Sequence, residues 1–371
     1  MTKVMTIVGT RPEIIRLAAT LKRLDETVDH ILVHTGQNYD YELNQIFFEE
    51  LGLRTPDHFL GVDTSSLGAV LGGVLVETER VLELEKPDAL LVLGDTNSCI
   101  AALMAARKGI PVYHMEAGNR SFDSNVPEET NRRMVDHVSD YNLAYTEHAR
   151  RNLLNEGKHP RQVLVTGSPM REVLAHQREK IDASDVLPRL GLSEQGYFLV
   201  SAHREENVDS PARLSNLLDA LEALYQKYGL PILVSTHPRT RKRLEALSRE
   251  VEGVTWHKPL GFNDYNCLQL NAACVLSDSG TIAEESTILG FPAVTLRDSI
   301  ERPEALDTGS IIMTGLDTEN VLEAVGIAMT RSNAEVPGDY CIENTSERAV
   351  NFIVSTYRRY GQWTGRRAYA D

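Results

Sequence analysis

The sequence lacks a long apolar run and has fewer positively than negatively charged residues. No stretch approaches the about 18 uninterrupted apolar residues of a membrane helix, and "MTKVMTIVGT" has no basic segment leading into an apolar one. The chain has 38 Lys and Arg against 53 Asp and Glu, a formal net charge of −15. Such a charge repels phosphate polymers and anionic lipid. We therefore expect no nucleic-acid partner, no membrane partner and a cytoplasmic location.

Cysteine and several cofactor motifs are also scarce or missing. The four cysteines are widely spaced and form no CxxC pair, which argues against a disulfide framework or a zinc site and favours buried or incidental thiols. The chain has no GxGxxG, GxxxxGK[ST], HExxH or Asp-x-Asp motif. Tight nicotinamide binding, Walker-type phosphate binding and obvious metal chemistry lose support, so we expect no metal site.

What is present is a regular alternation of short β-branched runs and helical patterns. Near-continuous apolar strands, each followed by a turn and a helical period, predict parallel sheets covered on both faces, and 371 residues suit two domains. We predict an α/β fold of two Rossmann-like, doubly wound domains. The charged stretch after Met170 lacks a strand signal, so we place the domains at 1–171 and 172–345. Apolar residues at helical spacing predict a closing helix within 346–371.

The turn "GTRPE" follows the first predicted strand. In open α/β sheets ligands bind beyond the carboxyl ends of the strands. Thr10 and Glu13 have capping-box spacing, and Pro12 suits the first helical position. Arg11 beside the free N–H groups of a helix start would form an anion site. The alternative is a well-capped first helix with a surface arginine.

"VLSDSGTIAEES" repeats this design in the second half. Ser279 and Gly280 could hold a diphosphate where a helix opens near Thr281. Glu284 and Glu285 would then either favour the helix dipole or bind sugar hydroxyls. Ordinary helix capping is the alternative. Two such sites in separate domains favour a nucleotide-diphosphate ligand.

Other polar groups follow the remaining strands. His203 and Arg204 add cationic candidates after "YFLVSA", and His237 is a weaker one. Arg302 in "IERPEALDTGS" could bind an anion or pair with its neighbours.

The first half supplies carboxylates at the same kind of position. "HMEAGNRSFDSNVPEE" gathers several acids after an apolar run, and we expect them at the edge of the first sheet. Asp95, Glu116 and Glu128 are candidate proton carriers. Each alone could be a solvated or capping carboxylate, Glu128 especially because Pro127 starts a helix.

Seven motifs in order, "GTRPE", "GDTNS", "HMEAGNR", "VPEETNRR", "HREEN", "SDSGTIAEES" and "ERPEA", resemble the non-hydrolysing UDP-N-acetylglucosamine 2-epimerases over nearly the whole chain. The resemblance implies a glycosyltransferase type B arrangement with a UDP-sugar in the cleft, a homodimer, no added cofactor, and a last helix that packs back on the first domain. It implies inversion of C2 by anti elimination of UDP to a 2-acetamidoglycal and re-addition.

The resemblance also assigns roles by motif. It implies that Asp95, Glu116 and Glu128 are the catalytic carboxylates and that His203 is an essential histidine near the diphosphate. The remaining residues that we assign to binding of the substrate or its UDP are Arg11, Arg16, Gln37, Arg204, His237, Ser279, Gly280, Thr281, Glu285 and Arg302.

Several positions depart from the commonest family pattern. Arg16 stands where that pattern has lysine, and Thr281 where it has a second glycine. With these changes the sequence resembles the capsule and O-antigen branch of the family more than its commonest members. That branch makes UDP-N-acetyl-L-fucosamine from its talo isomer. The alternatives are a UDP-GlcNAc/UDP-ManNAc 2-epimerase proper, a glycosyltransferase of the same fold, a hydrolysing 2-epimerase and a non-catalytic UDP-sugar sensor.

Overall fold

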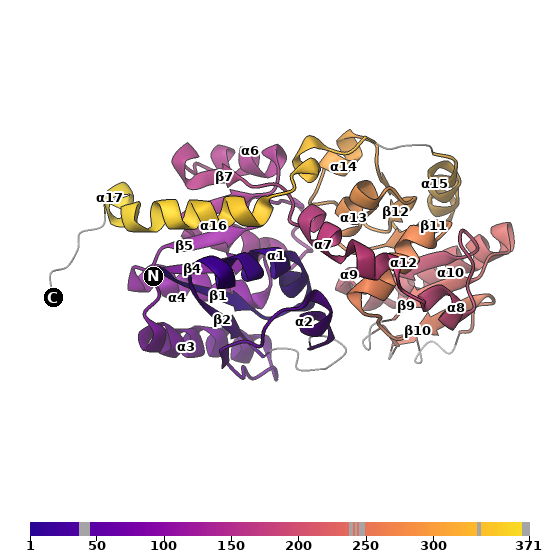
Figure 1. Cartoon of the computed structure of the whole chain (residues 1–371). Coiled ribbons are helices and arrows are strands. Elements are labelled where there is room, and N and C mark those ends of the chain that lie inside the picture. The colour runs from indigo at the N-terminus through magenta and orange to yellow at the C-terminus, as the bar shows by residue number, and fades with distance from the viewer. Residues whose placement is uncertain (37–44, 237–239, 242, 245–248, 332–334, 366–371) are drawn as a thin grey trace. The chain divides into compact units, whose positions relative to one another are not determined.

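The computed structural model describes the chain except residues 37–44, 237–239, 242, 245–248, 332–334 and 366–371 (Figure 1). Its contacts divide the chain into two compact units. Unit 1 comprises 1–120, 127–175 and 342–371, and unit 2 comprises 121–126 and 176–341. The sequence placed the boundaries at 171/172 and 345/346, a few residues from these, and gave no sign that 121–126 group with unit 2.

Unit 1 is built on a seven-stranded, all-parallel sheet of order β3-β2-β1-β4-β5-β6-β7. Apolar residues fill both faces of its central strands, and β4 is buried at every position, as expected for a sheet covered on both sides. The strands are β1 (Lys3–Val8), β2 (Asp29–His34), β3 (His58–Phe59), β4 (Ala89–Leu93), β5 (Val112–Met115), β6 (Tyr141–Ala144) and β7 (Val163–Val165).

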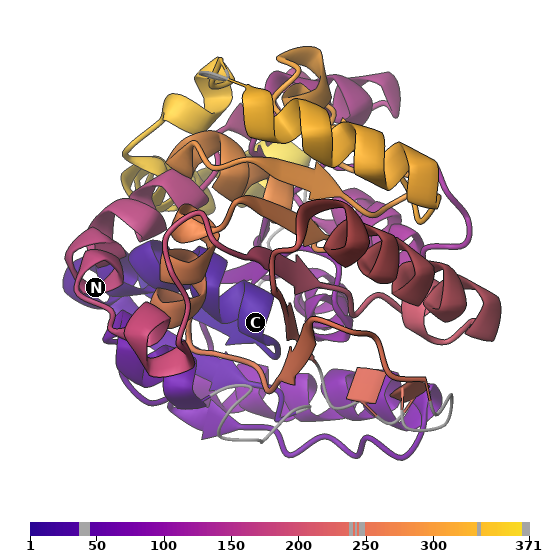
Figure 2. The ribbon, with the colours of Figure 1, turned by 90° about the vertical axis from the view of Figure 1, so that its right-hand side faces the viewer.

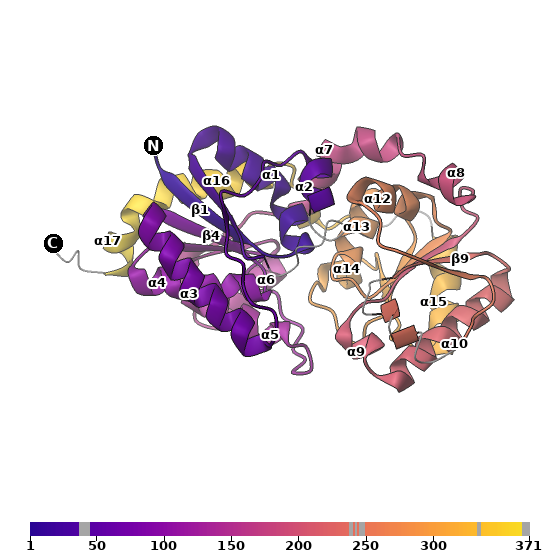
Figure 3. The same cartoon turned by 90° about the horizontal axis from the view of Figure 1, so that it is seen from below.

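Helices cover both faces of this sheet. One group, α3, α4 and α5, packs side by side on one face, and α1 lies on the other beside α16 (Figure 3). The helices of unit 1 are α1 (Arg11–Thr27), α2 (Ile46–Leu51), α3 (Leu67–Glu85), α4 (Ala101–Lys108), α5 (Glu128–Val138), α6 (Glu147–Asn155), α16 (Thr345–Thr356) and α17 (Tyr360–Thr364), with 3₁₀ turns Asn97–Ile100, Pro160–Gln162 and Tyr357–Arg359.

Unit 2 repeats the design with a six-stranded, all-parallel sheet of order β10-β9-β8-β11-β12-β13. Its main core lies under α10 and α15, which run side by side (Figure 2). The strands are β8 (Phe198–Ser201), β9 (Ile232–Ser235), β10 (Val254–His257), β11 (Cys274–Ser277), β12 (Ala293–Thr295) and β13 (Ile312–Met313). The helices are α8 (Val186–Leu190), α9 (Glu205–Val208), α10 (Pro211–Tyr228), α12 (Phe262–Asn271), α13 (Ile282–Leu289), α14 (Glu304–Asp307) and α15 (Thr318–Thr330), with a 3₁₀ turn Gly338–Cys341. The helix α7 (Met170–Asp182) crosses from one unit to the other.

The helix α16 belongs to unit 1 and packs against α1 (Figure 1). Val350 and Ile353 are buried on its inner face, and the Tyr113 and Thr356 hydroxyls lie 2.7 Å apart. The closing helix therefore completes the core of the unit that the first strand begins.

Among the described residues, no helix combines the length and the apolar content that crossing a membrane requires. All four cysteines are free thiols, and three of them are buried.

Candidate functional site

The predicted residues of unit 1 lie on turns at the carboxyl edge of its sheet. Arg11 begins α1 directly after β1, Asp95 follows β4, and Glu116 follows β5. Since β1 pairs with β4 and β4 with β5 in parallel, these three turns are neighbours along one edge.

The turn after β1 is closed by a buried carboxyl rather than by the predicted capping box. The Thr10 side chain accepts no capping hydrogen bond; its hydroxyl donates to Glu13 Oε2 at 2.8 Å, and the same oxygen accepts the Gly9 N–H at 3.0 Å. Ser98 donates to the other oxygen of Glu13. Burial raises the pKa of Glu13, against the lowering effect of these hydrogen bonds. Glu13 therefore ties the turn after β1 to the one after β4, while the Arg11 guanidinium lies 5.6 Å from the centre of the Phe47 ring.

Glu116 forms a buried ion pair with Arg16 of α1. Its backbone is in the left-handed region at φ +65°, which costs a non-glycine residue about 1–3 kcal/mol unless its surroundings fix it. A Cβ placed on Gly94 would lie 3.8 Å from Glu116 Oε2, so the carboxylate sits against the turn that leads into Asp95. Strain of this kind clusters at functional sites.

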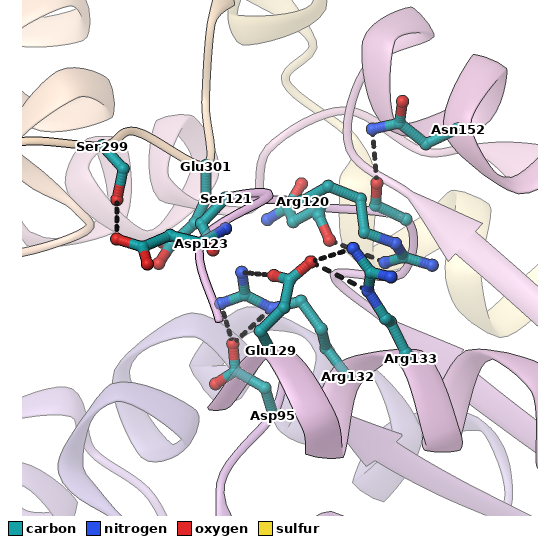
Figure 4. Close-up of polar contacts among 12 residues, drawn as sticks. Asp95, Arg120, Ser121, Asp123, Glu129, Arg132, Arg133, Asn152, Ser299 and Glu301 are labelled. Atoms are coloured by element: carbon teal, nitrogen blue, oxygen red, sulfur yellow. Dashed lines mark hydrogen bonds and ion pairs between the residues drawn. The ribbon is translucent and has the colours of Figure 1, made fainter. Parts of the chain in front are cut away.

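Asp95 is held by Arg132 of α5 (Figure 4). Arg132 Nε donates to Asp95 Oδ2 at 3.0 Å, and its Nη1 donates to Glu129 Oε2 at 2.9 Å. Arg133 donates to the other oxygen of Glu129 at 3.0 Å. The predicted acidic patch is thus a set of carboxylates matched by arginines. Glu128, partly exposed, is the first residue of α5 after Pro127.

In unit 2, the His203-Arg204 turn after β8 is organised by Asp278, a fully buried carboxylate. Asp278 accepts the backbone N–H of His203 at 3.1 and 3.0 Å and that of Arg204 at 3.0 Å. It also accepts the Asn207 amide at 3.0 Å and lies 3.2 Å from His203 Nδ1. One aspartate at the end of β11 therefore shapes the turn after the neighbouring β8.

Gly280 lies where two arginine side chains approach the backbone. A Cβ there would lie 2.9 Å from Arg302 Nη1 and 3.5 Å from Arg204 Nη2, so a larger residue would displace a guanidinium. Arg302 donates to the Gly280 carbonyl at 2.6 Å and pairs with Glu284 at 3.0 Å. The Ser279 and Thr281 hydroxyls, 2.9 Å apart, complete the turn before α13. This turn brings guanidinium and hydroxyl donors together at one strand end.

The two glutamates of α13 have separate protein partners. Glu284 is fully buried and pairs with Arg302 as described above, and Glu285 accepts the Gln269 amide at 2.7 Å.

In the segment 121–126, Asp123 accepts the Ser299 hydroxyl at 3.4 Å, which ties that segment to unit 2 (Figure 4). The predicted Gln37 and His237 lie outside the described residues.

Sequence reasoning missed the side chains that hold these turns. The motifs indicate Asp278 only as part of a donor-rich turn, and they give no role to His114, Arg132 or Asp136. A histidine inside the otherwise apolar strand "VYHM" and an aspartate on the inner face of an amphipathic helix are the signals that could have found them, since a buried polar group needs a partner.

Comparison with known proteins identifies the family. The sequence pattern of the UDP-N-acetylglucosamine 2-epimerases matches residues 21–354. This chain belongs to that family. It is therefore an isomerase of the non-hydrolysing 2-epimerase type.

Individual relatives agree over nearly the full chain. A UDP-N-acetylglucosamine 2-epimerase of Methanocaldococcus jannaschii is 39% identical over 96% of this chain and 100% of that protein. A crystal structure of a Methanocaldococcus jannaschii UDP-GlcNAc 2-epimerase in complex with UDP-GlcNAc and UDP gives a TM-score of 0.90, covering 95% of this chain and 100% of that one at 36% identity. The Rickettsia bellii UDP-N-acetylglucosamine 2-epimerase structure gives 0.92 at 44% identity, covering 98% and 100%. A UDP-2,3-diacetamido-2,3-dideoxy-D-glucuronate 2-epimerase of Pseudomonas aeruginosa is 35% identical, covering 89% of this chain and 93% of that protein.

A rhamnosyltransferase of spinosyn, only 12% identical, shares the fold with a TM-score of 0.54. The two parallel-sheet units thus form a glycosyltransferase type B-like fold.

Proposed function

We propose that the protein inverts C2 of a UDP-N-acetylhexosamine by eliminating UDP and adding it back. The observation that carries this proposal is the pair of carboxylates Asp95 and Glu116 at adjacent strand ends of unit 1, each held by an arginine from a neighbouring helix. Two positioned proton carriers suit a reaction that removes a proton from one face of a carbon and returns one to the other.

The chemistry favours elimination over simple deprotonation. No carbonyl adjacent to C2 acidifies its hydrogen, so the proton leaves more easily as the C1–O bond to UDP breaks and the electron pair forms the C1–C2 double bond. A carboxylate takes the C2 proton and gives a 2-acetamidoglycal plus UDP. In the return step a second carboxylic acid protonates C2 from the opposite face, and the UDP oxygen closes the bond to C1. The reaction consumes no other reactant, so we propose that it needs no cofactor.

Stabilisation of the leaving UDP supplies much of the remaining rate. General acid–base catalysis gives about 10²–10⁴-fold, short of the 10⁶-fold or more typical of enzymes. We propose that preorganised hydrogen-bond donors bind the leaving diphosphate. They are His203 and Arg204 on the turn shaped by Asp278, with Ser279 and Arg302 at Gly280. In unit 1, Arg11 lies at the start of α1, where the free N–H groups favour an anion. We assign Glu128 as a further proton carrier beside Asp95 and Glu116.

The substrate is the finer part of the proposal. Names of the relatives above favour UDP-N-acetylglucosamine, and we place it first. The second candidate is the talo precursor of UDP-N-acetyl-L-fucosamine in capsule or O-antigen synthesis. It is favoured by Arg16, which replaces the lysine of the commonest pattern and pairs with Glu116.

Assembly and location are also proposed. The resemblance supports a homodimer, which sedimentation velocity would test. Free thiols, one of them exposed at Cys341, suit a reducing compartment such as the cytoplasm.

The testing experiment incubates the protein with UDP-N-acetylhexosamines of gluco, talo and fuco configuration in deuterated buffer and follows the products by NMR. We expect the C2 epimer of the UDP-sugar, with solvent deuterium at C2 and no net release of UDP. A glycosyltransferase would leave the UDP-sugar unchanged when no acceptor is added. A hydrolysing epimerase would release free sugar at the rate at which UDP appears, and a UDP-sugar sensor would bind without turnover.

A further inference from the structure

His114 and Asp136 form a fully buried pair beneath the carboxyl edge of unit 1. His114 lies within β5 and Asp136 near the end of α5, and neither is accessible to solvent. His114 Nδ1 is 2.9 Å from Asp136 Oδ1, and His114 Nε2 is 2.8 Å from the Gly94 carbonyl oxygen. Neither side chain has a part in the proton transfers described above.

The pair fixes the backbone beside both catalytic candidates. Gly94 directly precedes Asp95, and Gly118 stands two residues after Glu116. The Gly118 N–H donates to both oxygens of Asp136, at 3.2 and 3.1 Å. One histidine–aspartate pair thus links the turn that carries Asp95 to the turn that carries Glu116.

Gly118 is held from its other side as well. The Asn152 amide donates to the Gly118 carbonyl at 3.0 Å (Figure 4). At φ +86°, a Cβ on Gly118 would lie 2.3 Å from the Ala149 carbonyl oxygen, so the turn is pressed against α6. These contacts fix the backbone two residues after Glu116, and a left-handed residue persists only where its surroundings fix it.

Polar groups of the protein surround the pair. Nδ1 of His114 faces the Asp136 carboxylate and Nε2 faces the Gly94 carbonyl, so an oxygen atom holds each ring nitrogen. Burial raises the pKa of Asp136, but the hydrogen bond and charge of His114 and the charge of Arg120 outweigh it and hold that pKa below its ordinary value. Arg120 Nη1 donates to Asp136 at 2.7 Å, and Glu156 accepts from the same guanidinium at 2.8 and 2.6 Å. The network therefore sets the Arg120 guanidinium between the Asp136 and Glu156 carboxylates.

We propose that His114 and Asp136 are positioning residues that set the spacing between the Asp95 and Glu116 carboxylates. They touch no reacting atom and act only through the backbone of Gly94 and Gly118. The proposal rests on the proposed function, because it takes those carboxylates to be the proton carriers. Its consequence is that loss of the pair lowers the rate of proton transfer while leaving the donors of unit 2 intact.

The experiment compares three variants with the parent protein. Asp136→Asn removes the charge at nearly constant shape, and Asn152→Ala releases Gly118 from the partly exposed α6. Glu156→Gln is the matched control, since it alters the outer end of the same network away from both turns. For each variant we would measure KM and kcat, with kcat expressed per UDP-binding site as counted by calorimetry. Deuterium incorporation at C2 and the melting temperature would be measured on the same samples.

We expect kcat of Asp136→Asn to fall about 10²-fold, the loss that a displacement of about 1 Å causes, with KM within about threefold of the parent. Asn152→Ala should lose kcat by about 3- to 10-fold and stay folded, so it decides the question if Asp136→Asn does not fold. Glu156→Gln should stay within about twofold.

An unchanged kcat per UDP-binding site in Asn152→Ala would overturn the positioning role and leave the proposed function standing. A loss of kcat in Glu156→Gln as large as that in Asp136→Asn would do the same. A parent protein that binds UDP but incorporates no deuterium at C2 of any substrate would overturn both.

Discussion

The two units share one architecture but use their strand ends differently. In unit 1, Asp95 and Glu116 are carboxylates held by arginines from helices. In unit 2, a single buried carboxylate, Asp278, gathers backbone N–H groups so that His203 and Arg204 end on a shaped turn. The same edge of a parallel sheet therefore presents proton carriers in one unit and hydrogen-bond donors for an anion in the other.

This difference teaches that position in a doubly wound sheet predicts where a site lies, whereas its chemistry depends on which side chains hold each turn. If the division is correct, damage to the carboxylates of unit 1 should lower turnover without weakening UDP binding, whereas damage to unit 2 should weaken UDP binding as well as turnover.

The largest effect is expected from Glu116→Gln. Removing a proton carrier should lower kcat by about 10²–10⁴-fold, while the dissociation constant of UDP changes little. Initial rates by coupled assay and calorimetry with UDP would measure the two quantities. Glu147→Gln on α6, whose side chain is 48% exposed, is the control and should match the parent. A large loss of UDP affinity with normal turnover would contradict the role given to unit 1.

Asp278→Asn should weaken UDP binding, unlike Glu116→Gln. The amide would direct a donor at N–H groups that need an acceptor, and hydrogen bonds to a charged group contribute about 1.5–3 kcal/mol. We expect UDP to bind about 10- to 100-fold more weakly, measured by calorimetry. The exposed Asp185→Asn in the same unit controls for the change of charge. Full UDP affinity in Asp278→Asn would remove the basis for comparing the two units.

Arg16→Lys sharpens the account of unit 1. Lysine keeps the charge but is a flexible point donor that cannot reproduce the planar guanidinium. Loss of about one hydrogen bond should lower kcat about 3- to 10-fold. Arg23→Lys on the same helix, 41% exposed, is the control. An Arg16→Lys variant as active as the parent would show that Glu116 needs only a nearby positive charge.

The last prediction concerns the stability of unit 1 and not its activity. Burial lowers the pKa of His34 to about 4, from an ordinary 6.5. Between these values the unfolded chain binds a proton that the folded chain does not, so the free energy of unfolding falls as pH falls, by about 1.4 kcal/mol per unit. Urea unfolding at pH 7, 6 and 5 would measure this slope, and His34→Gln should reduce it. An equal slope in that variant would assign the effect to another group.

Much of the fold was predictable because buried parallel strands appear as apolar runs. The runs that end at Val8, Leu93 and Leu276 all form central strands. The two-residue strands β3 and β13 were not predicted, since a strand so short has no periodicity.

The site was predictable in place but not in its contacts. Position after a strand identified Asp95, Glu116 and His203, whereas their holders lie far away in sequence. Arg132 is 37 residues from Asp95, and Asp278 is 75 from His203. Thr10 and Glu13 had the right spacing for a capping box, but the carboxyl instead closes the turn at Gly9. Tertiary hydrogen bonds decided what spacing alone could not.

The most direct test of the central claim is the fate of the C2 hydrogen during one turnover in deuterated buffer. The account predicts that the epimerised UDP-N-acetylhexosamine carries solvent deuterium at C2 and that ¹⁸O placed in the C1–O bond scrambles, because UDP leaves and returns. Epimerisation with the original hydrogen retained at C2 and the ¹⁸O label unmoved would contradict it.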